Sequence, residues 1–245
     1  MANRLDKTLV SLGHCESRNK AQQCITAGYV EVNGVVITNA SFIVKNDDVV
    51  VLKQHLNYVS RGGEKLAEAL KHLKLSPKKL TCLDIGASTG GFTDCLLQHG
   101  AEQVFSVDVG TNQLHPSLKS NPKVHCFENT HVDQLNLLPL PSVIDWAVID
   151  VSFISLSQVL PVVCNTLEQH QGQLILALLK PQFEHALFKT KSKTITANQA
   201  KQSPEKLKQA LQATCPHWEI IEAFPLTTEL SQTFCEYMIL LKPIR

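Results

Sequence analysis

The sequence lacks several features that would assign it to common classes of protein. No apolar run reaches the roughly 18 residues of a membrane span, and the longest candidate, Leu174–Leu179, ends at Lys180. The N-terminus has no apolar signal core, so we expect a soluble, cytoplasmic protein that does not contact membranes. The eight cysteines include no C-x-x-C pair. This argues against a metal site or a disulfide framework and favours buried free thiols.

The chain also has little net charge, only +1, because 23 Lys and Arg residues oppose 22 Asp and Glu residues. Taken alone, this balance argues against a nucleic-acid-binding protein. The charge is unevenly distributed, however: residues 81–184 carry 3 basic and 10 acidic side chains, whereas residues 61–80 carry 6 and 2, and residues 185–210 carry 6 and 1. Such asymmetry concerns binding partners rather than the fold. Either basic segment alone is better explained as a solvated, lysine-rich helix face, and only its place beside a motif favours a functional role.

Residues 1–53 predict a small module of two helices followed by three strands. Leucines at helical spacing form the first helix, and Ser17 can cap the second helix, which Gly28 ends. Asn33-Gly34 lies between two β-type runs, and this dipeptide is a strong hairpin signal because both turn positions need φ > 0. Residues 54–63 lack periodicity and form the expected linker.

From residue 64 onward, β-type runs alternate with helical patterns, which predicts an α/β domain with a mostly parallel sheet and helices on both faces. The expected strands cover residues 80–85, 102–108, 123–128, 144–150 and 173–179. The expected helices cover residues 64–73, 91–99, 113–119, 155–166 and 203–214, the last opened by Ser203-Pro204. The final strands, 218–223 and 235–242, predict an antiparallel hairpin at the sheet edge.

A glycine-containing loop, residues 84–93, follows the first strand of this sheet and runs into a helix. It is not a P-loop, because G-K-[ST] is missing, and Gly86 and Gly90 lie too far apart for the dinucleotide fingerprint. An acid before the first glycine instead suits S-adenosylmethionine, whose cationic end Asp84 could meet directly or through water. Asp108, at the end of the second strand, could accept hydrogen bonds from two ribose hydroxyls. The alternative is a tight strand–helix turn with a capping aspartate.

Charged residues follow two apolar strands of the predicted sheet. Asp150 closes one strand and Lys180 another, and ligands of open parallel sheets bind outside these carboxyl ends. We therefore expect the two side chains to meet over the site, although each could also belong to a structural ion pair. Lys65 follows a glycine pair at the start of the linking helix. Glu236 lies in an apolar run, where a carboxylate is costly unless paired, so we expect a lysine of the site as its partner.

Several stretches match a known family. They are Arg4-Leu5-Asp6, Ser17-Arg18, Ala27-Gly28-Tyr29-Val30, Val32-Asn33-Gly34, and residues 60–66, 84–93, 150–155, 180–184 and 236–237. On these residues the chain resembles the TlyA (hemolysin A-like) family of rRNA 2′-O-methyltransferases over essentially its whole length. The resemblance implies an S4-type RNA-binding domain over residues 1–53. It also implies an FtsJ/RrmJ-like, Rossmann-like S-adenosylmethionine-dependent methyltransferase domain over residues 64–245.

The resemblance also implies roles for individual residues. A catalytic Lys–Asp–Lys–Glu tetrad falls on Lys65, Asp150, Lys180 and Glu236. The S-adenosylmethionine site falls on Asp84, Gly86, Ser88, Thr89, Gly90, Gly91, Phe92, Asp108 and Thr130. Contacts to ribosomal RNA or ribosomal subunits fall on Arg4, Lys7, Arg18, Lys20 and Arg61. The expected reaction methylates a ribose 2′-hydroxyl, on cytidine of 16S or 23S rRNA, without a metal. Lys180 would act as general base or stabilise the developing alkoxide.

The chain departs from the family pattern in its RNA-facing and closing segments. The departures are Asn39, Thr130-His131-Val132-Asp133, the lysine-rich residues 185–199 with Lys189, Lys191 and Lys193, and Thr233-Phe234. Three other functions are possible: a catalytically inactive S4 protein that assists ribosome assembly, a membrane-active hemolysin, and a nicotinamide-dependent oxidoreductase. The intact tetrad argues against an inactive S4 protein, and the lack of a spanning or amphipathic segment argues against a hemolysin. The glycine spacing argues against an oxidoreductase.

Overall fold

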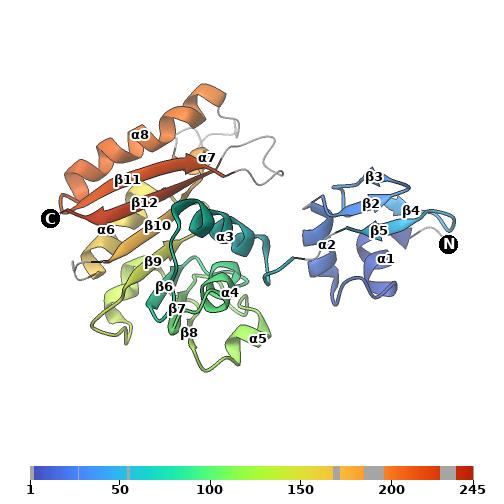
Figure 1. The fold of residues 1–245 in the computed structure, drawn as a ribbon, viewed down its shortest axis with the longest axis horizontal. Helices are drawn as coiled ribbons and strands as arrows, with labels where there is room; N and C mark the ends of the chain where they lie inside the picture. Colours follow the sequence, from blue (N-terminus) through green and yellow to red (C-terminus); the bar gives the residue numbers. More distant parts are fainter. Residues whose placement is uncertain are drawn as a thin grey trace.

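The computed structural model describes residues 3–26, 28–53, 56–167, 172–184, 196–226 and 236–244. Figure 1 shows a small N-terminal module and a larger layered domain that contains the C-terminus. The elements of the module are β1 (Asn3–Arg4), α1 (Leu5–Ser11), α2 (Arg18–Thr26), β2 (Val30–Val32), β3 (Val35–Val36), β4 (Ile43–Val44) and β5 (Val50–Leu52). Its buried apolar residues form a core of their own.

Local sequence explains most of the module. The Ser17 hydroxyl accepts a hydrogen bond from the backbone of Lys20 at 3.2 Å, so the predicted cap of α2 is confirmed. Asn33 and Gly34 both have positive φ in the turn that joins β2 to β3, which confirms the hairpin. β1 pairs with β4 in a separate two-stranded sheet that we did not predict, because strands of two residues are too short to show periodicity.

The larger domain contains a seven-stranded sheet in the order β11-β12-β10-β9-β6-β7-β8. Its strands are β6 (Thr81–Ile85), β7 (Gln103–Val107), β8 (Val124–Phe127), β9 (Trp146–Ile149), β10 (Leu174–Leu179), β11 (Trp218–Pro225) and β12 (Tyr237–Pro243). The strands from β8 to β10 run parallel, whereas β12 runs antiparallel to both of its neighbours, β10 and β11, so the α/β fold and the terminal hairpin are confirmed. Of the hairpin strands, β11 forms the edge and β12 lies between β10 and β11.

Helices cover both faces of this sheet. They are α3 (Arg61–Leu73), α4 (Gly91–Gln98), α5 (Pro116–Lys119), the 3-10 helix η1 (Val132–Leu137), α6 (Leu156–Thr166), α7 (Pro181–Glu184) and α8 (Ala197–Thr214). Alternate residues of β10 therefore enter different cores. Leu176 packs in the core that contains α3 and α4, whereas Ile175 packs in the core that contains α6 and α8. Burial on both faces explains why β10 is wholly apolar until Lys180.

Three helix starts differ from the prediction by three residues or more. α5 begins at Pro116 rather than at residue 113, because His115 caps the helix and Pro is favoured at its first position. α3 begins at Arg61 rather than at residue 64, so the glycine pair forms its first turn instead of part of the linker. α8 begins at Ala197, because Thr196 and Gln199 form a capping box, and Ser203-Pro204 therefore lies inside the helix. The Ser203 hydroxyl bonds back to the carbonyl of Gln199 instead of capping the helix.

Candidate active site

The glycine loop between β6 and α4 lies beside the carboxyl ends of the central strands. Gly86 has φ +81°, and a Cβ atom there would lie 2.6 Å from the carbonyl oxygen of Asp150. Only glycine permits both this backbone angle and this close approach. Gly90 also has positive φ, but a Cβ atom there would strike Leu118 and Leu114, so Gly90 packs against α5 rather than facing a cavity.

Asp84 lies beneath the loop rather than in it. Its side chain is fully buried and accepts a hydrogen bond from the hydroxyl of Thr93 at 2.6 Å. Burial raises the pKa of Asp84 to about 7, although the Thr93 hydrogen bond acts in the opposite direction. Asp84 lines neither cavity described below, so a direct contact with a ligand, one of the two modes that we expected, does not fit this geometry.

Two adjoining cavities lie above the loop. The Asp108 cavity has a volume of about 350 Å³, and the Lys180 cavity has a volume of about 250 Å³. Gly86, Ser88, Asp150 and Ser152 line both. Of the residues predicted to bind the cofactor, Asp108 and Thr130 line the Asp108 cavity but not the Lys180 cavity. Thr89, Gly91 and Phe92 line the Lys180 cavity but not the Asp108 cavity. Neighbouring strand ends thus form a continuous polar site, as in other open α/β sheets.

Backbone amides fix Asp108 at the end of β7. Its two carboxylate oxygens accept hydrogen bonds from the N–H groups of Ser88 and Gly110, both at 2.7 Å. Each oxygen keeps a second lone pair for a further donor. Next to it, His131 caps η1, because its Nδ1 atom accepts a hydrogen bond from the Asp133 N–H at 3.4 Å. His131 and Asp133, which depart from the family pattern, therefore stabilise the start of η1.

The first turn of α3 packs directly on the first turn of α4. A Cβ atom on Gly91 would lie 2.3 Å from the Ser60 hydroxyl and 2.8 Å from the backbone nitrogen of Gly63. A Cβ atom on Gly63 would overlap the ring of Tyr58. The glycine pair therefore permits a close contact that joins α3 to α4.

Asp150 and Lys180 meet over the site, as the strand-end argument predicted. Lys180 Nζ lies 2.5 Å from Asp150 Oδ1 and donates a hydrogen bond to the Ser152 hydroxyl at 2.9 Å. The side chains of Lys180 and Asp150 are only 11% and 21% exposed, and both line the Lys180 cavity. Ser152 was not selected from the sequence, because its contact depends on the loop after β9.

Lys65 and Glu236 form a second ion pair, with Nζ and Oε2 separated by 2.6 Å. The predicted lysine partner of Glu236 is thus present. Glu236 directly precedes β12, and Tyr237 of β12 pairs with Leu179 of β10. The Lys65–Glu236 pair therefore lies beside Lys180, at the carboxyl end of β10. Lys65 and Glu236 are outside the residues that line the Lys180 cavity. All four tetrad residues therefore gather in one region, but only Asp150 and Lys180 face the cavity.

Two further residues in the matched stretches were not selected from the sequence. Glu184 accepts hydrogen bonds from the Leu156 N–H at 2.7 Å and from the Ser155 hydroxyl at 3.0 Å, which ties the segment after β10 to the start of α6. Burial raises the pKa of Glu184. Phe153 has φ +69°, is 80% exposed, and lines the Asp108 cavity with its ring near that of Phe183.

A buried carboxylate organises two of the predicted RNA contacts. Asp6 is fully buried and accepts hydrogen bonds from Arg4 at 3.0 and 3.1 Å, from Arg18 at 3.0 Å and from Gln22 at 2.8 Å. These donors hold the pKa of Asp6 well below its usual range. The arginines stay 37% and 53% exposed, so their outer N–H groups face solvent in a fixed orientation. Lys7 is also exposed.

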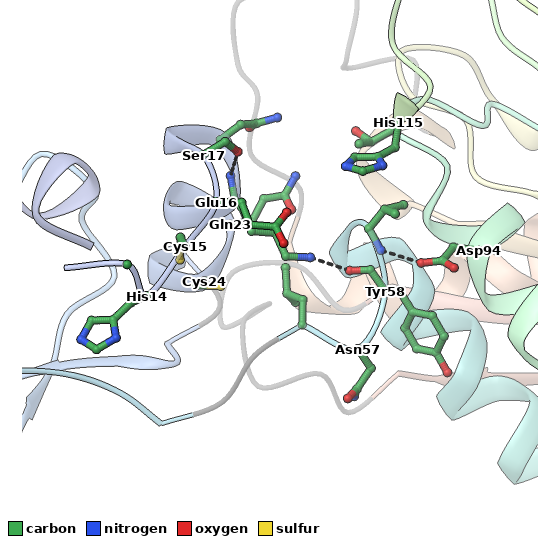
Figure 2. Close-up of a pocket in the computed structure, with 16 residues that line it drawn as sticks. His14, Cys15, Glu16, Ser17, Gln23, Cys24, Asn57, Tyr58, Asp94 and His115 are labelled. Atoms are coloured by element: carbon green, nitrogen blue, oxygen red, sulfur yellow. Dashed lines mark hydrogen bonds between the residues drawn. The ribbon is translucent and has the colours of Figure 1, made fainter. Parts of the chain in front are cut away.

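Lys20 and Arg61 lie between the N-terminal module and the larger domain. Lys20 Nζ donates a hydrogen bond to the carbonyl oxygen of Tyr58 at 2.8 Å, so it contacts the linking segment. Arg61 lines the Lys180 cavity. Figure 2 shows the interdomain cavity, about 470 Å³, between α2 and the segment that carries Tyr58.

Some predictions concern residues that the structure does not describe. Residues 185–195, with Lys189, Lys191 and Lys193, and residues 227–235, with Thr233-Phe234, are outside the described ranges. Six of the seven described cysteines are buried free thiols, and Cys126 is exposed. Within the described ranges, no cluster of His, Cys, Asp or Glu could hold a metal ion, and no helix is long and apolar enough to cross a membrane.

Known proteins share both parts of this chain. Residues 58–242 match the FtsJ-like methyltransferase family and residues 3–50 match the S4 domain. Hemolysin A of Brachyspira hyodysenteriae is 44% identical over 185 residues, which cover 74% of this chain and 75% of that protein. The 16S/23S rRNA (cytidine-2′-O)-methyltransferase TlyA of Mycobacterium tuberculosis is 38% identical over 183 residues, which cover 74% of this chain and 68% of that protein. A solved structure described as "Putative hemolysin from Streptococcus thermophilus" superposes with a TM-score of 0.70 at 31% identity, over 99% of this chain and 88% of that one.

Proposed function

Because the chain belongs to the family of FtsJ-like methyltransferases and carries an S4 domain, we propose that it methylates ribose 2′-hydroxyl groups of ribosomal RNA with S-adenosylmethionine as methyl donor. The observation that carries this proposal is the position of Lys180. Its ammonium group, held by Asp150, lines a cavity that adjoins the one against Asp108. A hydroxyl and a methyl donor can therefore meet above Gly86.

The Asp108 cavity fits S-adenosylmethionine in size and in chemistry. Asp108 offers carboxylate lone pairs to ribose hydroxyls, and Val107, Val132 and Ile154 offer an apolar surface for adenine. Ser88, Asp150 and Ser152 line its boundary with the Lys180 cavity. When bound there, S-adenosylmethionine supplies an electrophilic methyl group.

Lys180 supplies the charge that this reaction needs. A ribose hydroxyl is a weak nucleophile until its proton begins to leave. The Lys180 ammonium stabilises the negative charge that develops on the hydroxyl oxygen, and the departing proton passes to the carboxylate of Asp150. Ser152 and Asp150 fix the ammonium on one side of the cavity. The Lys65–Glu236 pair supports the neighbouring strand end.

The S4 domain brings RNA to this site. Arg4 and Arg18, fixed by Asp6, present guanidinium groups that suit phosphate oxygens, and Lys7 adds charge beside them. TlyA of Mycobacterium tuberculosis is a 16S/23S rRNA (cytidine-2′-O)-methyltransferase. By this relationship we propose cytidine in 16S or 23S rRNA as the target of the present chain.

The decisive experiment is methyl transfer from labelled S-adenosylmethionine to free 16S rRNA, free 23S rRNA and intact subunits, followed by mapping of the modified nucleotide. Replacement of Lys180 by Ala should lower the single-turnover rate about a hundredfold or more, without weakening S-adenosylmethionine binding.

Lys123→Ala is the matched control, because Lys123 is exposed and directly precedes β8, at the opposite end of the parallel strands. Its rate should equal that of the wild type. A Lys180→Ala rate close to that of the wild type would contradict the role of Lys180. Label on protein or on base atoms only would contradict the reaction itself.

A further inference from the structure

Gln23 places part of the S4 domain in the wall of the Lys180 cavity. This residue belongs to α2, yet it lines the cavity together with Asp150 and Lys180. It also lines the interdomain cavity. Thr89, in the glycine loop, is the other residue that borders both cavities. Gln23 of the S4 domain and Thr89 of the methyltransferase domain therefore lie where the interdomain cavity meets the Lys180 cavity.

The amide oxygen of Gln23 has no hydrogen-bond partner among the described residues, although it is buried. A buried carbonyl oxygen without a donor is unfavourable, and relief requires a donor group within reach. The cavity beside the side chain provides room for one. Rotation about the flexible side-chain torsions would move the amide from its packed position into that cavity.

Two hydrogen bonds hold α2 in this position relative to the methyltransferase domain. Lys20 Nζ donates to the carbonyl oxygen of Tyr58, and the next residue, Val59, donates its N–H to Asp94 at 2.8 Å. Asp94 belongs to the first turns of α4, the helix that follows the glycine loop. Figure 2 shows Tyr58 and Asp94 across the cavity from α2. The position of Gln23 is thus tied to the loop that lines the same site.

We propose that Gln23 is a substrate-positioning residue, which accepts a hydrogen bond from the 2′-hydroxyl of a nucleotide adjoining the methylated one. The inference rests on the proposed function. Gln23 lies where the interdomain cavity meets the Lys180 cavity, so an RNA strand bound by both domains can contact it. Phosphate oxygens carry no proton to donate to a carbonyl oxygen, whereas each ribose 2′-hydroxyl does. The same contact distinguishes RNA from DNA at this point.

A double-mutant cycle tests this contact. The substrate is an rRNA fragment that contains the mapped target nucleotide, prepared also with a single 2′-deoxy nucleotide on its 5′ or 3′ side. For the wild-type enzyme, one of the two deoxy substitutions should lower kcat/KM about fivefold, the size of one lost neutral hydrogen bond. Gln23→Ala should lower kcat/KM about fivefold on the all-ribose fragment. On the variant, the same deoxy substitution should then have no further effect.

Two other variants separate this role from a structural one. Gln23→Met keeps the volume of the side chain without hydrogen-bonding groups, and it should reproduce the loss and its insensitivity to the deoxy substitution. Asn19→Ala, on the same helix, lines the interdomain cavity only and should behave like the wild type. The S-adenosylmethionine Kd should be unchanged in all three variants.

The contact would be overturned if Gln23→Ala and Gln23→Met both kept the wild-type kcat/KM. It would also be overturned if the deoxy substitution lowered kcat/KM by the same factor in the variants as in the wild type. Either result would leave the methyltransferase assignment intact. Absence of methyl transfer to any RNA by the wild type would overturn the proposed function and this role with it.

Discussion

Replacement of Asp84 by Asn should change how the stability of the methyltransferase domain depends on pH. Burial raises the pKa of Asp84 from 3.8 to about 7 in the folded protein. Between these values the unfolded chain loses the proton while the folded domain keeps it, so ionisation favours the unfolded state. The contribution of Asp84 to the free energy of unfolding is therefore fully present below about pH 4, and it is lost as the pH rises through 7.

The magnitude follows from the size of the shift. One pKa unit corresponds to about 1.4 kcal/mol, so the free energy of unfolding should fall by about 3 kcal/mol between pH 5 and pH 8 because of Asp84 alone. Asn does not titrate, and its amide carbonyl can still accept the hydrogen bond from Thr93. The amide nitrogen of the variant then takes the unpartnered position of Asp84 Oδ1, and the resulting loss of stability should be equal at every pH. The difference between variant and wild type therefore isolates the ionisation.

Urea unfolding at several pH values, followed by tryptophan fluorescence, measures this difference. Both tryptophans, Trp146 and Trp218, lie in the seven-stranded sheet, so the signal reports on this domain. Thr93→Val removes the hydroxyl that favours the carboxylate, and it should extend the loss of stability to higher pH. A difference between Asp84→Asn and wild type that stays constant from pH 5 to pH 8 would refute the reasoning.

Two other predictions follow from contacts in the site. Asp6→Asn removes a negative charge, so net charge alone would strengthen RNA binding. If Asp6 acts by orienting Arg4 and Arg18, affinity in a filter-binding assay should instead fall severalfold at both low and high salt, and a rise would contradict that role. Gly91→Ala should destabilise the domain by about 1–3 kcal/mol, because its Cβ would meet the backbone of α3, whereas Gly62→Ala, with no atom closer than 3.5 Å, should be tolerated in the same unfolding assay.

The sequence predicted features that depend on local pattern. The sheet strands appeared as apolar runs because both faces of the sheet are buried, and the pairing of Asp150 with Lys180 followed from the rule that parallel strands end at one edge. The lysine partner of Glu236 followed from the cost of a buried carboxylate. Each of these inferences needs only the chain and one general rule.

Features that depend on packing between distant segments could not be predicted in the same way. Asp84 was placed near a ligand because it precedes the glycine loop, but Thr93 and the surrounding core enclose it. Asp6 was recognised as part of a matched stretch, but its contact with Arg18 needs the angle between α1 and α2. Gln23 had no distinguishing feature in the sequence, since its position depends on how α2 lies against the larger domain.

The insertion of β12 between β10 and β11 has a consequence for the order of folding. Glu236 reaches Lys65 only after the last strand of the described chain has paired with β10, so the tetrad joins residues from opposite ends of the domain. Long-range pairing of this kind costs loop-closure entropy before it gains contacts, and it slows folding. During synthesis, the parallel strands and the glycine loop can assemble while the second ion pair is still incomplete. The Asp150–Lys180 pair can thus form before the Lys65–Glu236 pair, which forms only when β12 pairs with β10.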